Sequence, residues 1–271
     1  MTKYNININF FENPPLWGQK QAYFLGWFGS DGYNSLENKI MLELQEKDKK
    51  ILELLKKSIE YTGPLYYKNL SLYNRTPGQC KTKNGYREIK STNSWRLQIA
   101  RKKISEDLKK LGITNAKSGK YIFPEFLKDE LIPHFLRAYY EGDGSFSYHC
   151  RYLPNRKRIE FKITLLGTNE FLLKVKQILK EKLNIESKIS KCDRVKIDIQ
   201  CLSFASNYGA LKLFNYLYKD ANMLLKRKFR KFLKLINYMK KVNFNNFHSE
   251  TKTETQKAII LAKWLVKNAQ Y

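Results

Sequence analysis

The chain has 271 residues, and 51 Lys and Arg against 25 Asp and Glu give it a formal net charge of +26. Hydrophobic residues make up 42% of the sequence and aromatic residues 14%, which predicts a folded chain with a substantial core. Such an excess of positive charge argues against an enzyme of neutral metabolites and favours a polyanionic partner, above all nucleic acid.

Cysteine and histidine usage argues against a metal or disulfide framework. The four cysteines form no C-x-x-C pair and the three histidines are scattered, so neither a zinc site nor a set of disulfides is predicted. The amino terminus lacks the apolar core of a signal peptide, and no apolar run is long enough for a membrane span. We therefore expect an intracellular protein without a membrane partner, in the cytoplasm of a bacterial or phage host or in an organelle matrix.

The first half of the chain predicts helices and strands in alternation. It opens with an apolar helix that ends at Asp31-Gly32, and later segments alternate polar and apolar residues with the period of a strand. The polar segment 71–93 contains Pro77-Gly78 and Asn84-Gly85, which predict a long hairpin or loop. The remaining predicted elements are strands at 39–45 and 95–99, a helix capped by Asp48 that carries Ile51 to Ile59, and a helix at 101–111.

The second half repeats this plan. Another apolar helix ends at Asp143-Gly144, 112 positions after the first such turn. The elements predicted after it are strands at 158–165 and 194–200, a helix capped by Thr168, and helices at 203–218, 222–241 and 253–268. We therefore predict one repeat at 1–130, a second at 131–241, and a carboxy-terminal linker and helix at 242–271.

The two apolar helices share a pattern of small residues followed by aspartate. Small residues stand four positions apart, at Gly26 and Ser30 in one helix and at Ala138 and Gly142 in the other. This spacing places them on one helix face and allows two backbones to approach closely. An aspartate directly follows the second small residue in both helices, so close packing of the helices is expected to bring Asp31 and Asp143 together.

Two neighbouring carboxylates must share a proton or bind a cation. Hard divalent ions such as Mg²⁺ take oxygen ligands, and commonly combine few protein carboxylates with phosphate oxygens of a substrate. A single such helix is most simply an ordinary core helix that ends in an Asp-Gly turn. Two copies in the same register favour a metal-dependent reaction on a phosphodiester.

The segments Phe24-Leu-Gly-Trp-Phe-Gly-Ser-Asp-Gly32 and Leu136-Arg-Ala-Tyr-Tyr-Glu-Gly-Asp-Gly144 resemble the paired motifs of LAGLIDADG homing endonucleases. Flanking segments resemble the family as well, and the likeness covers about residues 18–240. These segments are Asp48 at a helix start, Leu108-Lys-Lys-Leu-Gly-Ile113, Asn115-Ala-Lys-Ser118 and Leu225-Lys-Arg-Lys-Phe229. The sixth motif position, acidic in the family name, is Gly29 in the first copy and Glu141 in the second, which predicts an asymmetric helix interface.

The resemblance implies an α+β fold of two pseudo-symmetric αββαββα repeats, with paired motif helices at the centre and two saddle-shaped antiparallel sheets in the DNA major groove. By position, Asp31 and Asp143 are the implied catalytic, metal-binding acids, with the carbonyl groups of Ser30 and Gly142 as further ligands of Mg²⁺ or Mn²⁺. Lys117 and Lys228 are the implied central basic residues, with Arg227 as an alternative to Lys228. The open-face residues expected to contact DNA are Lys39, Glu43, Gln45, Arg87, Arg96, Gln98, Arg158, Glu160, Lys162, Arg194, Lys196 and Asp198.

The resemblance implies a monomeric enzyme that makes a site-specific double-strand break with short 3′ overhangs in a long asymmetric DNA target. Two other functions stay open on the same fold. An intron maturase would bind intron RNA and assist splicing, and a regulator would bind DNA without cutting it. Retention of both aspartates argues against the regulator, and a maturase is distinguished by splicing activity that survives their loss.

Overall fold

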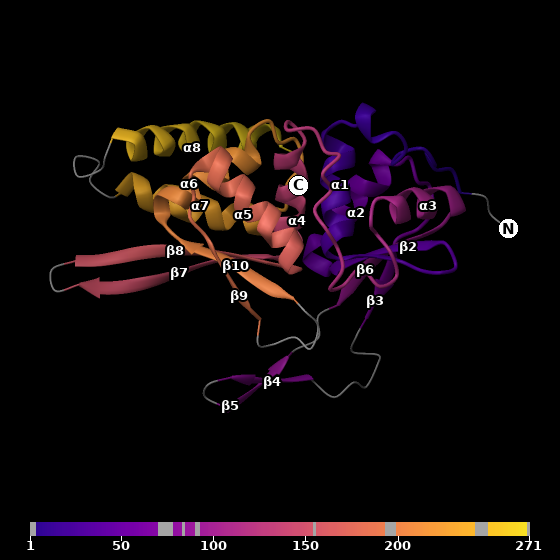
Figure 1. Ribbon diagram of the computed structural model, residues 1–271, viewed down its shortest axis with the longest axis horizontal. Helices are drawn as coiled ribbons and strands as arrows, with labels where there is room; N and C mark the ends of the chain where they lie inside the picture. Colours follow the sequence, from indigo (N-terminus) through magenta and orange to yellow (C-terminus); the bar gives the residue numbers. More distant parts are fainter. Residues whose placement is uncertain are drawn as a thin grey trace.

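The computed structural model describes residues 4–69, 78–82, 85–89, 93–153, 156–192, 199–241 and 249–269. Two four-stranded antiparallel sheets lie side by side, and helices cover one side of both (Figure 1). The described helices are α1 Gln19–Ser30, α2 Lys49–Ser58, α3 Lys102–Lys110, α4 Ile132–Asp143, α5 Asn169–Leu183, α6 Asn207–Tyr218, α7 Lys226–Lys241 and α8 Ser249–Asn268, with short 3₁₀ turns at Pro14–Leu16 and Glu46–Asp48. This order confirms the predicted α+β fold of two similar repeats.

The first sheet has the strand order β1-β2-β6-β3. Its strands are β1 Gly32–Asn34, β2 Lys39–Gln45, β3 Tyr66–Lys68 and β6 Ser94–Ala100. In β2 the apolar residues Ile40, Leu42 and Leu44 are buried while the residues between them keep solvent access, as the period-two pattern predicts. The predicted polar hairpin is present as β4 Gly78–Thr82 paired with β5 Gly85–Ile89, and it extends away from the helices (Figure 1).

The second sheet has the corresponding order β7-β8-β10-β9. Its strands are β7 Gly144–Leu153, β8 Arg156–Gly167, β9 Lys188–Lys191 and β10 Gln200–Ala205. Phe161, Ile163 and Leu165 of β8 are buried under the helices, and the alternate side chains are partly exposed. Both repeats therefore bury one sheet face beneath helices and leave the other face accessible.

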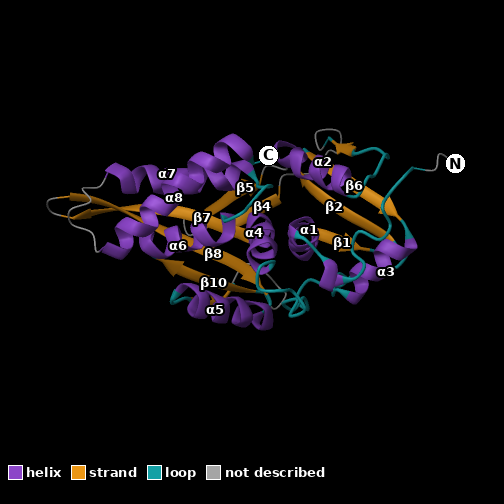
Figure 2. Ribbon diagram, turned by 90° about the horizontal axis from the view of Figure 1, so that it is seen from above, coloured by secondary structure: helices purple, strands orange, loops and turns teal. Residues whose placement is uncertain are grey.

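Helices α1 and α4 lie side by side between the two sheets (Figure 2). They approach closely at Gly26, where a Cβ atom would lie 2.3 Å from the Phe135 carbonyl oxygen and 2.8 Å from the Ala138 Cβ. Only a residue without a side chain permits this separation, so the small-residue spacing has the effect that the sequence predicts. The helix pair joins the cores of the two repeats into one hydrophobic cluster.

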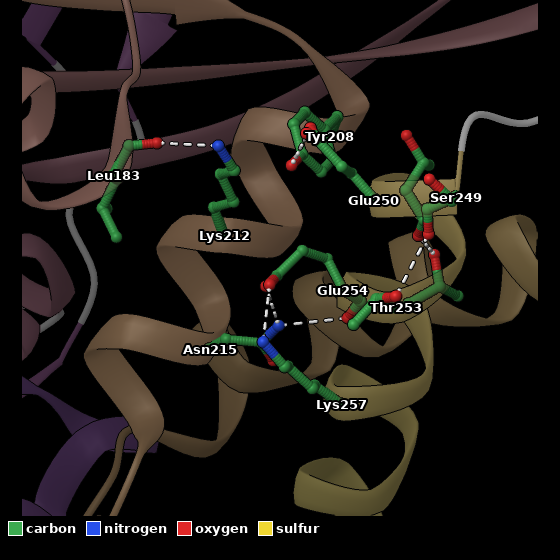
Figure 3. A network of polar contacts seen from close by, with 11 residues as sticks. Leu183, Tyr208, Lys212, Asn215, Ser249, Glu250, Thr253, Glu254 and Lys257 are labelled. Atoms are coloured by element: carbon green, nitrogen blue, oxygen red, sulfur yellow. Dashed lines mark hydrogen bonds and ion pairs between the residues drawn. The ribbon is translucent and has the colours of Figure 1, made fainter.

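Helix α8 packs on α6 of the second repeat (Figure 3). The Tyr208 hydroxyl of α6 donates to Glu250, and the Asn215 amide donates to both the backbone carbonyl and the carboxylate of Glu254. The buried residues of α8 are Thr255, Ala258, Ala262 and Leu265. Its acidic residues therefore face α6, which makes α8 a packing element.

Several predicted boundaries need correction. Residues 203–205 belong to β10, so α6 begins at Asn207 and not at 203, because Ser206 caps its first turn through Gly209 N–H. The helix predicted at 222–241 begins at Lys226, and the one predicted at 253–268 begins at Ser249. The strand predicted at 194–200 falls mostly outside the described residues. In the part of the chain that the structure describes, no helix is both long and apolar enough to span a membrane.

The two predicted helix caps have different outcomes. Thr168 caps α5 as predicted, accepting a hydrogen bond from Phe171 N–H. Asp48 stands at the N-cap position of α2 as predicted, but its side chain makes no capping hydrogen bond. Its carboxylate instead accepts hydrogen bonds from Arg227, which follows it by 179 positions in the sequence. A local sequence pattern cannot reveal a partner that is so distant in the chain.

Candidate active site

The two motif aspartates stand at the carboxy-terminal ends of the paired helices. Asp31 caps α1 with its N–H bonded to the Trp27 carbonyl, and Asp143 is the last residue of α4. The free carbonyl groups at these helix ends carry partial negative charge, so a carboxylate at either position is electrostatically unfavourable. Two helices that end side by side with one aspartate each thus concentrate negative charge at one place.

Gly142 brings the end of α4 directly against Asp31. A Cβ atom on Gly142 would lie 2.6 Å from Asp31 Oδ2 and 2.2 Å from Ser30 Oγ. The Asp31 carboxylate is therefore in contact with the backbone that immediately precedes Asp143. Glycine at this position allows the two acids to come close, while Ser30 Oγ turns back to the carbonyl groups of Gly26 and Trp27.

The environment raises the pKa of both carboxyl groups. Loss of hydration is the main cause for Asp31, although the residue keeps solvent access, and the positive charges of Lys117 and Arg227 oppose it. For the half-buried Asp143, burial and then the negative charge of Asp31 raise the pKa to about 6. Because the two acids repel each other, a bound cation would stabilise them. Both keep enough solvent access for a cation to reach them.

Lys117 occupies the end of α1. Its Nζ donates to the carbonyl oxygens of Gly29 at 2.9 Å and Ser30 at 2.7 Å, and its side chain is almost completely buried. Burial lowers the pKa of Lys117, whereas the charges of Asp143 and Asp31 raise it. A lysine at a helix carboxy terminus satisfies the free carbonyl groups and offsets the negative end of the dipole.

Lys228 occupies the corresponding place beside α4. It lies in the first turn of α7, is buried, and donates from Nζ to the carbonyl oxygen of Gly144. Burial, and then the charge of the neighbouring Arg227, lower the pKa of Lys228 to about 8. Arg227 itself donates to both oxygens of Asp48 at 3.0 and 2.8 Å. Of the two alternatives, Lys228 therefore contacts the motif turn, while Arg227 joins the second repeat to the start of α2.

The donor set suits a hard divalent cation. Asp31 and Asp143 offer carboxylate oxygens at adjoining helix ends, and oxygen is the ligand atom that Mg²⁺ prefers. The Ser30 carbonyl already accepts a hydrogen bond from Lys117, so as a metal ligand it would share its oxygen with an ammonium group. The two aspartates are thus the best-supported candidate ligands, ahead of the carbonyl groups of Ser30 and Gly142.

Sequence reasoning missed a buried polar network behind the site. Glu141 is fully buried and accepts hydrogen bonds from the hydroxyl groups of Tyr23 and Tyr218 and from Leu225 N–H. Burial raises the pKa of Glu141, and the charge of Arg137, one turn earlier on α4, opposes that effect. The sequence signal was an acidic residue inside an otherwise apolar helix. Glu141 thus links α4 to α1, α6 and the segment before α7. The acidic residue at the sixth position of the second motif therefore holds the helices together.

The sixth position of the first motif has a different neighbour. A Cβ atom on Gly29 would lie 2.8 Å from the ring of Tyr121, which stacks on Tyr139 at a ring-centroid distance of 6.2 Å. Tyr121 belongs to the segment that follows Lys117, and its carbonyl accepts a hydrogen bond from Thr168. The glycine thus lets this connecting segment lie close enough for Lys117 to reach the end of α1.

Many of the predicted DNA contacts share the accessible face of a sheet. On the first sheet these residues are Lys39, Glu43, Gln45, Arg96 and Gln98, and on the second they are Glu160 and Lys162. Arg87 lies in β5 and Arg158 in β8, where the structure describes the backbone alone. The remaining three predicted contacts, Arg194, Lys196 and Asp198, lie outside the described residues. Sequence reasoning missed Lys68 of β3 and Ser94 of β6, which both bond to Glu43.

Comparison with known proteins places the fold. No protein-family model and no curated protein matches the sequence. The structure is similar to I-LtrWI, a LAGLIDADG homing endonuclease bound to target DNA, with a TM-score of 0.52 and 14% sequence identity over 93% of this chain and 99% of that one. It also matches I-SmaMI bound to an uncleavable DNA, with a TM-score of 0.49 and 12% identity over 90% and 97% of the chains. The chain therefore has the fold of LAGLIDADG homing endonucleases, as the motif resemblance implies.

Proposed function

We propose that this protein is a site-specific DNA endonuclease that hydrolyses one phosphodiester in each strand of a long asymmetric duplex. The observation that carries the proposal is the pair of aspartates at the adjoining ends of α1 and α4, where Gly142 contacts the Asp31 carboxylate. The net charge of +26 suits a polyanionic substrate, and the structurally similar I-LtrWI is bound to its target DNA.

We propose that each of the two repeats binds one half of the DNA target. Each repeat offers one accessible antiparallel sheet face, and the two differ in side chains, which suits an asymmetric target. One chain supplies both motif helices and both sheets, so we propose that it acts as a monomer. A 3′-overhang product and a role in intron homing belong to the same proposal.

At the centre, Asp31 and Asp143 would hold Mg²⁺, or Mn²⁺ in its place, close to the scissile phosphates. When bound, this ion would stabilise the charge that develops on the phosphate and lower the pKa of water. Lys117 and Lys228 each stand at one motif helix end, where their charges offset the carbonyl groups and help the site accept an anionic backbone. The buried Glu141 network keeps α4 in place relative to α1.

The test is cleavage of a randomised long-duplex library in Mg²⁺ by the wild-type protein and by Asp31→Asn/Asp143→Asn. We expect selective double-strand cuts from the wild type, a loss of at least about 100-fold in the variant, and retained duplex binding in both. Asp129→Asn is the matched control, because Asp129 is an exposed acid paired with Lys182. Cleavage by the double variant at the wild-type rate would refute the proposed role of the aspartates.

A further inference from the structure

Four side chains from three strands meet on the accessible face of the first sheet. Arg96 donates from Nε at 2.9 Å and from Nη2 at 2.5 Å to one oxygen of Glu43. The other carboxylate oxygen of Glu43 accepts from Ser94 at 2.7 Å and from Lys68 at 3.3 Å. We call these four residues the Glu43 cluster.

The strand register accounts for this cluster. Glu43 of β2 lies directly opposite Arg96 of β6, and Ser94 stands two residues from Arg96 on the same sheet face. Lys68 of β3 pairs with Ser94 and therefore projects from the same side. The side chains of Glu43, Arg96 and Lys68 each keep about a third of their surface exposed, at 31%, 33% and 32%. The cluster is thus fixed by backbone pairing and remains open to a ligand.

The carboxylate of Glu43 is occupied by neighbouring side chains and is therefore poorly placed to contact a DNA base. Partial burial raises the pKa of Glu43, but hydrogen bonds from Ser94 and Arg96 outweigh that effect and leave the pKa lowered. An ionised carboxylate accepts hydrogen bonds only, and both of its oxygens are already engaged by these three donors. Glu43 therefore orients Arg96, and the cluster keeps a net positive charge toward a DNA groove.

The orientation of Arg96 leaves one defined edge of its guanidinium group free. Nε and one hydrogen of Nη2 are bonded to Glu43, and among the described residues Nη1 has no acceptor. The free edge therefore presents two parallel N–H donors, one from Nη1 and one from Nη2. In the major groove guanine offers two adjacent acceptors, O6 and N7, and arginine binds them in a bidentate manner.

We propose that Arg96, held in place by Glu43 with the help of Ser94 and Lys68, recognises a guanine in the half-site bound by the first repeat. Arg96 is then a specificity-determining residue and Glu43 a positioning residue that does not touch the base. This inference rests on the proposed function, because it requires that the accessible sheet face lies in a major groove. A bidentate pair of this kind discriminates against another base by roughly 5- to 150-fold.

The experiment is selection of bound duplexes from a randomised library in Ca²⁺, followed by sequencing, with the full-length wild type and two variants. Arg96→Lys keeps the positive charge but cannot form the two parallel bonds, and Glu43→Gln keeps the shape but loses the negative charge. We expect the wild type to select a guanine at one half-site position. Arg96→Lys should reduce that preference by roughly 5- to 150-fold, and Glu43→Gln should weaken it at the same position.

Lys102→Gln is the control, because Lys102 is an exposed lysine of α3 that pairs with Glu106 and is not part of the accessible sheet face. It should leave the guanine position unchanged. A wild type that selects no sequence would overturn the proposed function and this inference together. A wild-type profile with a selected site that neither Arg96→Lys nor Glu43→Gln alters at a guanine would overturn this inference alone.

Discussion

Replacing Gly26 by alanine tests the packing on which the candidate site depends. The new Cβ would lie 2.3 Å from the Phe135 carbonyl oxygen and 3.0 Å from Tyr139 N, both backbone atoms that no rotamer change can move. Since C···O contacts are normally about 3.3 Å or longer, α1 and α4 must separate by about 1 Å. We expect this overpacking to destabilise the fold by about 3 kcal/mol, near the upper end of the usual range. The better helix propensity of alanine offsets about 1 kcal/mol of that loss.

We therefore expect Gly26→Ala to lower the free energy of unfolding by about 2 kcal/mol. The measurement is urea-induced unfolding followed by tryptophan fluorescence, to which the fully buried Trp27 of α1 contributes. Gly18→Ala is the control, because its Cβ would meet nothing closer than Gln21 Oε1 at 3.8 Å. Its expected cost is below about 1 kcal/mol. Equal midpoints for Gly26→Ala and the control would show that the helix contact does not require glycine.

Gly142→Ala should behave differently at the other end of the same interface. Its Cβ would meet Ser30 Oγ at 2.2 Å and Asp31 Oδ2 at 2.6 Å, which can rotate away, and Ser30 Cβ at 2.7 Å, which cannot. Relief of this one fixed contact requires a smaller separation of the helices than Gly26→Ala does. The expected loss of stability is smaller, at about 1 kcal/mol, whereas displacement of the Asp31 carboxylate should reduce DNA cleavage by at least about 10-fold. Unfolding and cleavage measured on the same preparations separate the two effects. A variant that cleaves at the wild-type rate would contradict the inferred contact.

Two further predictions concern buried polar groups. Asp48→Asn removes the charge from a carboxylate that is 3% exposed and leaves its half-exposed partner Arg227 unpaired. Unfolding stability should therefore fall by about 1–3 kcal/mol, and an unchanged stability would show that the pair contributes nothing. His134 is buried beside Arg137, and burial and then that charge lower its pKa to about 3. In the unfolded chain the pKa of a histidine is about 6.5, so the stabilising contribution of neutral His134 is complete above that pH. Below it, the free energy of unfolding falls by up to about 1.4 kcal/mol per pH unit until the pH reaches about 3. Urea unfolding between pH 7 and 5 should show a shallower decline for His134→Gln, and identical slopes would refute this assignment.

The sequence by itself determined the elements and their main contacts. Period-two alternation placed β2 and β6, and the small-residue spacing with Asp31 and Asp143 predicted two packed helices with adjoining acidic ends. Thr168 predicted the start of α5. These features depend on residues within a few positions of each other, or on a motif that occurs twice, so local propensity and pattern are sufficient to reveal them.

Only the tertiary structure decided which distant groups meet. Asp48 suits a helix cap in its local sequence, yet the fold gives it Arg227 as a partner. Glu141 lies in a motif position associated with acids, yet three donors enclose it in the core. Glu43 resembles a solvent-facing strand residue until β3 and β6 bring their donors to it. Buried or partly buried charges need partners wherever the chain can supply them, and chain topology, which local sequence does not encode, determines those partners.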